Sequence, residues 1–154
     1  MIGDLDRYEM EKVLRRQFIG RIACHANDVT YIVPISYAYD GTYIYCHTYE
    51  GMKIHMLRQN PKVCFEVEIM ENMGNWKSVI AWGEFEELIN PDERKKGIQE
   101  LLDRTLPVVS EKFKTATHWP FPPSDLNKVN GIVFRVKLTE KTGKFEQSEP
   151  PYTT

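Results

Sequence analysis

The sequence predicts a mainly β protein, in which about six antiparallel strands form a small barrel or closed sheet flanked by helices. Two observations lead to this fold class. The strand-like runs are rich in Val, Ile, Thr and Tyr and are separated by turn residues, so neighbouring strands form hairpins. The helical patterns stand at the front and late in the chain instead of alternating with the strands. A Rossmann fold is therefore not expected.

The chain of 154 residues is expected to form one domain over residues 1–146, with a loose tail at 147–154. A formal net charge of -2 provides no basic field for nucleic acid. No apolar run approaches the roughly 20 residues that span a bilayer, and the charged N-terminus lacks an apolar signal core. Three widely spaced cysteines without a C-x-x-C pair indicate free thiols in a reducing compartment. These features predict a cytoplasmic protein.

The front of the chain, residues 4–17, predicts a helix, because Met10, Val13 and Leu14 share one helical face and Arg15 and Arg16 come late, as the helix dipole favours. Two hairpins are expected next, with strands at residues 20–26, 29–39 and 42–48.

The turns of these hairpins are predicted at Asn27-Asp28 and at Asp40-Gly41, because these residue pairs favour tight turns. Pro34 cannot donate a backbone hydrogen bond, so it predicts an edge position or an irregularity in its strand. An unpaired stretch of strand also has backbone groups that are free to meet a ligand.

Longer strands dominate the rest of the chain. Val63, Phe65 and Val67 occupy every second position, which is typical of a half-buried strand. Asn90 followed by Pro91 predicts the start of a helix. The expected elements are a short helix after residue 51, strands at 62–70 and 76–88, a helix at 91–106, a proline-rich connector at 118–127 and a closing strand or hairpin at 131–147.

The segment between the third strand and the short helix contains the main candidate for a binding site. Gly51 and Lys53 stand at the start of the helix, and Thr48 ends the incoming strand. The first N–H groups of a helix have no partner inside it, and the helix dipole and an ammonium group both favour an anion. A hydroxyl, free amides and one ammonium would suit a single phosphate. The same pattern also fits an ordinary helix cap with a solvated lysine.

His47 is the histidine nearest to this segment, and it is interpreted either as a ligand-facing residue or as a polar residue at the end of a strand. Cys46 precedes it on the same strand, so the two side chains point to opposite faces and are not expected to share a metal ion. The chain has no H-E-x-x-H motif and no Gly-x-Ser-x-Gly elbow, so neither a metal site nor a hydrolase is expected.

Aromatic residues are concentrated on the strands of the two hairpins, and most are expected to be core or interface residues. A barrel of this size is expected to bury some of them against a twofold partner. Trp119, in the proline-rich connector, is expected either to cover a flat ring or to pack under a loop. The clustered tyrosines are Tyr31, Tyr37, Tyr39, Tyr43, Tyr45 and Tyr49.

Taken together, these segments resemble the FMN-binding split barrel of pyridoxamine 5'-phosphate oxidase-like proteins, and within it the branch of the 5-nitroimidazole-resistance proteins. The resemblance covers residues 4–146 and implies a homodimer of six-stranded Greek-key barrels, with two FMN molecules at the subunit interface. The segments that carry it are FIGRIA, VPISYAYDGTYIYCHT, GMKIHMLRQNPKVCFEV, SVIAWGEFEEL and the closing VFRVKLTEKTGK.

The resemblance implies that Lys53 and Thr48 hold the FMN phosphate, with Met52 beside them. The other implied contacts are Val33, Pro34, Ile35 and Ser36 along the isoalloxazine and ribityl groups, Ser78 and Val79 at the border of the flavin, His47 near the ring or ribityl chain, and Trp119 from the partner subunit.

By this resemblance the protein is an FMN-dependent oxidoreductase for small electron acceptors such as nitroaromatics, reduced by NAD(P)H or another donor. The flavin carries the redox step, so no dedicated acid or base is required. His47 is the nearest proton donor if a reduced nitro group must be protonated. The stretch HTYEGMK has one lysine and no arginine, so oxidation of pyridoxamine 5'-phosphate itself is not expected.

Two other functions remain open from the sequence. The same fold could store or carry flavin, or bind haem or a deazaflavin, without turning over a substrate. A dimer with an empty pocket could also serve as an interaction or stress protein.

Overall fold

The computed structural model describes residues 1–104 and 126–148. Within these residues the chain forms eight strands and three α-helices, and all strand pairs are antiparallel. The elements are β1 (Ile2–Asp4), α1 (Arg7–Arg16), β2 (Ile19–Ala26), β3 (Val29–Ser36), β4 (Ala38–Tyr39), β5 (Tyr43–Thr48), α2 (Met52–Gln59), β6 (Lys62–Asn72), β7 (Asn75–Glu87), α3 (Pro91–Asp103), a 3₁₀ turn η1 (Leu126–Lys128) and β8 (Ile132–Gln147).

The mainly β class is confirmed, but the expectation of six strands is wrong. The two additional strands, β1 and β4, are three and two residues long. Strands this short carry no readable periodicity, and they exist because β1 pairs with β8 and β4 pairs with β5.

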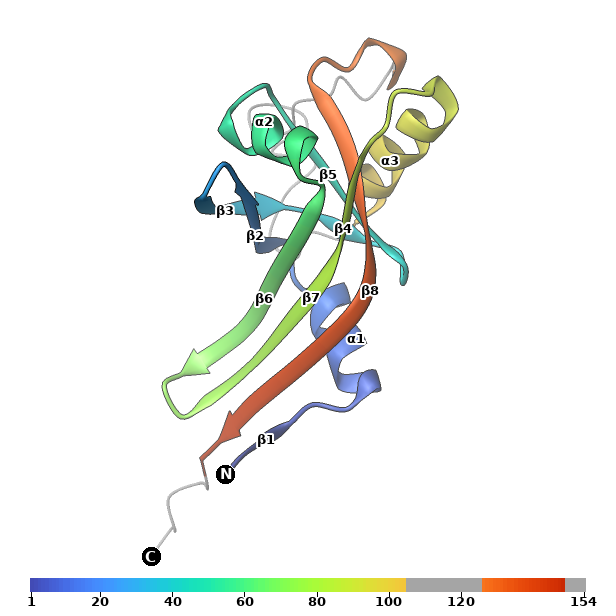
Figure 1. Ribbon diagram of the computed structural model, residues 1–154. Coiled ribbons are helices and arrows are strands. Elements are labelled where there is room, and N and C mark those ends of the chain that lie inside the picture. Colours follow the sequence, from blue (N-terminus) through green and yellow to red (C-terminus); the bar gives the residue numbers. More distant parts are fainter. Residues whose placement is uncertain (105–125, 149–154) are drawn as a thin grey trace, which may run out of the picture.

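The strands follow the order β3-β2-β6-β7-β8-β5-β4, with β1 on the side of β8. Strands β6, β7 and β8 form a long twisted ribbon, α1 lies beside it, and α2 and α3 lie toward its other end, on either side of it in this view (Figure 1). Among the described residues β3 pairs with β2 alone, which agrees with the first of the two expectations from Pro34, an edge position. Both predicted hairpins are present, and Asn27 and Asp28 have the positive φ values of 51° and 62° that a two-residue turn requires.

Two apolar clusters lie on opposite faces of β5. Ile44 and Cys46 belong to the larger cluster inside the curved sheet. Tyr45 belongs to a smaller cluster with Ile98 of α3 and Val133 of β8. Because side chains alternate along a strand, β5 separates the interior of the sheet from the face that α3 covers. This separation decides how the residues at the end of β5 are placed.

Several expected boundaries are corrected. The first helix begins at Arg7, because the Asp6 side chain accepts a hydrogen bond from Glu9 N and caps it there. The late helix ends at Asp103 with Arg104 as its C-cap, and residues 105–106 of its expected span lie outside the described residues. Gln147 and Ser148, expected in the loose tail, are hydrogen-bonded to Met1 O and Gly74 O. Within the described ranges no helix is long and apolar enough to cross a membrane.

Candidate functional site

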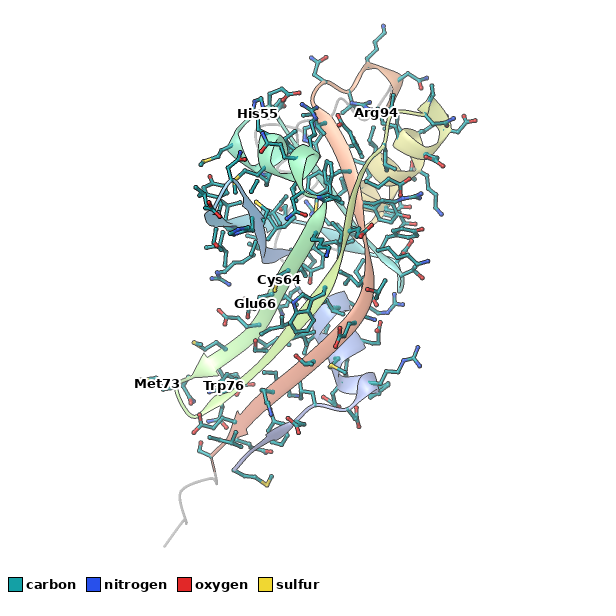
Figure 2. The ribbon with its side chains drawn as sticks, in the orientation of Figure 1. His55, Cys64, Glu66, Met73, Trp76 and Arg94 are labelled. Atoms are coloured by element: carbon teal, nitrogen blue, oxygen red, sulfur yellow. The ribbon has the colours of Figure 1, made fainter. Side chains whose placement is uncertain are left out.

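Helix α2 is held against the first hairpin by its apolar face and by two amide contacts. Ile54, Met56 and Leu57 are buried. Asn60, at the end of the helix, donates from Nδ2 to His25 O at 2.8 Å, and Asn27 Nδ2 donates to Gln59 Oε1 at 2.7 Å. These contacts fix the direction of α2. The helix lies toward the end of the molecule where Figure 2 labels His55 and Arg94.

The start of α2 has no side-chain cap. Gly51 occupies the N-cap position, no side chain in the described part of the chain caps the first turn, and that turn contains no acidic residue. Gly51 has an extended φ of 175°, which any residue adopts, and an added Cβ would meet nothing within 4 Å. The space beside the Gly51 Cα is therefore open among the described residues.

Lys53, in this first turn, is half-buried. Burial lowers the pKa of its ammonium group, and the buried thiols of Cys24 and Cys46 are the ionisable groups that act on it. The Lys53 ammonium makes no hydrogen bond or ion pair with the side chains or backbone of residues 1–104 and 126–148. Desolvating a charge without a partner costs free energy. A bound anion would offset that cost.

Thr48 and His47 end β5 on opposite faces. By alternation, Thr48 shares the interior face of Cys46 and therefore lies on the side of Lys53. His47 lies on the α3 side, where its Nε2 donates to Asn130 O at 2.6 Å and its ring packs edge-on to Tyr49. Thr48 is thus on the face of β5 that Cys46 shares, and the His47 ring is on the opposite face, which α3 covers.

The surroundings of His47 disfavour the second proton that would make its ring positively charged. Burial lowers its pKa, the nearby Arg94 guanidinium lowers it further, and the Asn130 carbonyl partly opposes this. Because a carbonyl only accepts, the neutral ring carries its single proton on Nε2 and donates it to Asn130. A role for His47 as catalytic proton donor stays a prediction.

The loop 129–131 closes over this side of the site. Arg94 of α3 donates from Nη2 to Val129 O at 2.7 Å and to Gly131 O at 3.1 Å. Gly131 has a φ of +92°, and an added Cβ would lie 2.7 Å from both His47 Nε2 and Thr48 O. Only glycine fits this approach, so Gly131 and Arg94 fix the loop against the end of β5.

The residues predicted on β3 divide between two faces. Ile35 is buried in the interior cluster and Val33 packs against it, whereas Pro34 and Ser36 are exposed on the outer face of the sheet. The outer edge of β3 is not paired with another strand of the sheet within the described residues. This edge carries the backbone groups that the sequence analysis expected to meet a ligand, and that contact stays a prediction.

The two residues predicted on β7 are also on opposite faces. Val79 is fully buried in the interior cluster, so only its backbone could border a ligand. Ser78 lies on the outer face, where its Oγ donates to Glu66 Oε1 at 3.0 Å. Met52 is exposed at the first position of α2. Trp119 lies outside the described residues, and within them no group of three His, Cys, Asp or Glu residues is placed to hold a metal ion.

The sequence analysis missed a charged cluster beside α2. Arg58 forms hydrogen-bonded ion pairs with Glu50, which precedes the helix, and with Glu87 at the end of β7. Arg94 was also missed. Glu50 and Arg58 are eight residues apart and only Arg58 is in the helix, so no helical spacing indicated the pair. The contributions of Glu87 and of the loop 129–131 depend on contacts between segments that are distant in the sequence.

Comparison with known proteins gives this fold and site a family. The family model for pyridoxamine 5'-phosphate oxidase matches residues 6–145. The chain belongs to this family. The protein RA0666 of Rhizobium meliloti (strain 1021) is 38% identical over 84 residues, which are 54% of this chain and 56% of that protein. The matched part therefore spans little more than half of that relative.

Solved structures extend the similarity to nearly the whole chain. A FAD-binding protein from Mesorhizobium loti is 28% identical, with a TM-score of 0.72, over 96% of this chain and 99% of its own. A protein from Bacteroides thetaiotaomicron VPI-5482, assigned to 5-nitroimidazole antibiotic resistance, is 17% identical with a TM-score of 0.72, over 94% of this chain and 87% of its own. The fold is thus the split barrel of the pyridoxamine 5'-phosphate oxidase-like proteins.

Proposed function

We propose that this protein binds a flavin, and specifically FMN, with the FMN phosphate at the start of α2. The observation that carries the proposal is the half-buried Lys53, which has no ion-pair partner within the described residues and stands in an uncapped first turn. An anion there would satisfy the first N–H groups, the helix dipole and the ammonium together. The FAD-binding relative from M. loti supports the choice of a flavin.

The donor set fits the terminal phosphate of FMN. It consists of one ammonium from Lys53, one hydroxyl from Thr48 and the first-turn amides, and the open space beside Gly51 admits the ligand. The pyrophosphate of FAD is bridged to an adenosine and would present its charge differently to these groups. Titrations with FMN and with FAD therefore distinguish which of the two flavins the protein prefers.

The proposed activity is the reduction of small electron acceptors such as nitroaromatics, with NAD(P)H or another donor. Bound flavin would supply the hydride and electron transfer. The residues of this chain would hold the phosphate at Lys53 and Thr48 and offer the free backbone edge of β3 to the ring. The similarity to the B. thetaiotaomicron protein supports this class of acceptor.

We further propose a homodimer with the flavin between the subunits. The outer face of the sheet exposes Ile19 and Ile32 at 61% and 60%, and Trp82 at 38%. Apolar side chains on one open sheet face are typical of an interface. Pro34, Ser36 and Ser78 are on this same face, so a flavin lying between two copies would be reached by residues that one subunit alone keeps apart.

The test begins with the absorbance of the purified protein and with titration of the apoprotein by FMN and by FAD. Flavin bands and tighter binding of FMN are expected. A Soret band would indicate haem, and absence of any flavin binding would overturn the proposal. Addition of NAD(P)H without oxygen, followed by a nitroimidazole, tests turnover. A bound flavin that no donor reduces would exclude the reductase activity, and a flavin carrier would remain as the function. Elution as an 18.1 kDa monomer at micromolar concentration would contradict the dimer.

A further inference from the structure

Arg58 is the centre of a clamp formed by two carboxylates beside α2. Its Nη1 and Nη2 donate to the two oxygens of Glu50 at 3.0 and 2.9 Å. Its Nε and Nη2 donate to the two oxygens of Glu87 at 3.1 and 2.9 Å. A guanidinium that engages both oxygens of a carboxylate fixes its orientation as well as its charge.

The clamp determines where the charge of Glu50 lies. Glu50 precedes the N-cap Gly51, whereas Arg58 is in the last turn of α2. At about 1.5 Å of rise per residue, the Arg58 backbone lies roughly 9 Å along the helix from its first residue. The Glu50 carboxylate is therefore drawn along the helix and away from its first turn.

Without the clamp, Glu50 would be the competing anion that is nearest in the sequence to the start of α2. It is one residue before Gly51 and three residues before Lys53. From that position its carboxylate could pair with the Lys53 ammonium or accept from first-turn N–H groups, as acidic residues near a helix start do. Such an internal anion would satisfy the groups that are proposed to hold the phosphate.

We infer that Arg58 and Glu87 are positioning residues that hold Glu50 away from the start of α2 and so keep Lys53 available for the cofactor phosphate. This inference rests on the proposed function. Glu87 anchors the clamp from β7, so the position of Arg58 does not depend on Glu50 alone. A role in stability alone would leave the Kd of an Arg58 variant for FMN unchanged when Glu50 is also removed, so rescue by that second change separates the two roles.

The test is a mutant cycle in the full-length protein, read out as the Kd for FMN by quenching of flavin fluorescence and as inorganic phosphate binding by calorimetry. Arg58→Gln is expected to weaken FMN binding about three- to tenfold, because the freed Glu50 competes for the site. Adding Glu50→Gln to Arg58→Gln should restore the wild-type Kd. Glu50→Gln alone should leave binding unchanged or tighter, and Glu87→Gln should weaken it less than Arg58→Gln.

The matched control is Arg135→Gln, which breaks another two-point Arg–Glu pair, with Glu86, away from α2. It should leave the Kd unchanged. An unchanged Kd in Arg58→Gln, or a loss that Glu50→Gln fails to restore, would overturn the clamp. If the wild-type protein binds neither FMN nor phosphate, the proposed function fails first, so the two failures are distinguishable.

Discussion

Helices α2 and α3 begin at the same end of the molecule in opposite ways (Figure 1). At α3 the Asn90 side chain accepts hydrogen bonds from the N–H groups of Asp92 and Glu93, and both of these acidic residues complement the helix dipole. At α2 the N-cap is a glycine without a side-chain bond, and the first turn contains Lys53.

The difference separates a start that stabilises the fold from one that is suited to a ligand. A capped, acidic first turn satisfies its own amides and has no use for an external anion. An uncapped first turn with a half-buried cation is unfavourable for folding by comparison, and it becomes favourable when an anion is added. The comparison therefore predicts that changes at α2 alter binding and that changes at α3 alter stability.

The largest effect is expected for Lys53→Met. Loss of a charge-assisted contact of about 1.5–3 kcal/mol should weaken FMN binding roughly ten- to a hundredfold. The Tm of the apoprotein should rise, because burial lowers the pKa of Lys53 and thus penalises its charged form. The measurements are a flavin titration and thermal unfolding. Lys95→Met in α3 is the control, and equal FMN affinities for the two variants would refute the phosphate assignment.

The next effect is expected when the start of α2 is made to resemble that of α3. Gly51→Asp introduces a capping carboxylate at a position where an added Cβ meets nothing within 4 Å. The variant should gain a few tenths of a kcal/mol in unfolding free energy and lose about tenfold in FMN affinity, because the carboxylate occupies the amides. Chemical denaturation and titration measure both. Undiminished FMN binding would mean that the phosphate lies elsewhere.

The converse change is Asn90→Ala at α3. Loss of the cap should lower the unfolding free energy by about 1 kcal/mol while the Kd for FMN stays the same. Urea denaturation of the apoprotein, followed by titration of the folded variant, measures the two quantities. A clear loss of affinity would show that the two helix starts do not have separate roles.

How far the sequence predicts this structure depends on the range of the interactions. The β2–β3 hairpin was predictable because Asn27, Asp28 and the flanking alternation are local. The strand β1 was not, because Ile2 to Asp4 become a strand only by pairing with Lys144 to Glu146 at the other end of the chain.

The same distinction holds at the site. Lys53 and Thr48 were identified from a local pattern. The alternation of side chains along the strand already placed Cys46 and His47 on opposite faces. The hydrogen bond from His47 to Asn130 and the ion pair from Arg58 to Glu87 join segments that no local pattern connects. The sequence therefore indicated the groups that would hold an anion but not those that orient them.

The smallest effect is the pH dependence of stability that His47 contributes. His47 contacts the loop 129–131, which Arg94 in the first part of α3 holds by hydrogen bonds. Burial lowers the pKa of His47 below its usual value near 6.5, so between these two pH values the unfolded chain binds more protons than the folded one. The stability that His47 contributes is therefore complete above about pH 6.5 and is lost as the pH falls toward the folded pKa. Glu11 and Asp40, whose pKa values are lowered, lose their contributions only below about pH 4.5.

His47→Gln retains a donor for Asn130 but does not titrate, so its unfolding free energy should vary less between pH 6.5 and pH 5 than that of the wild type. Urea denaturation at half-unit pH steps measures the slope. Asn90→Ala is the matched control, because it should lower stability equally across this range and leave the slope unchanged. A slope in His47→Gln equal to the wild-type slope would mean that another group titrates there, and that the His47 to Asn130 hydrogen bond does not couple the loop to pH.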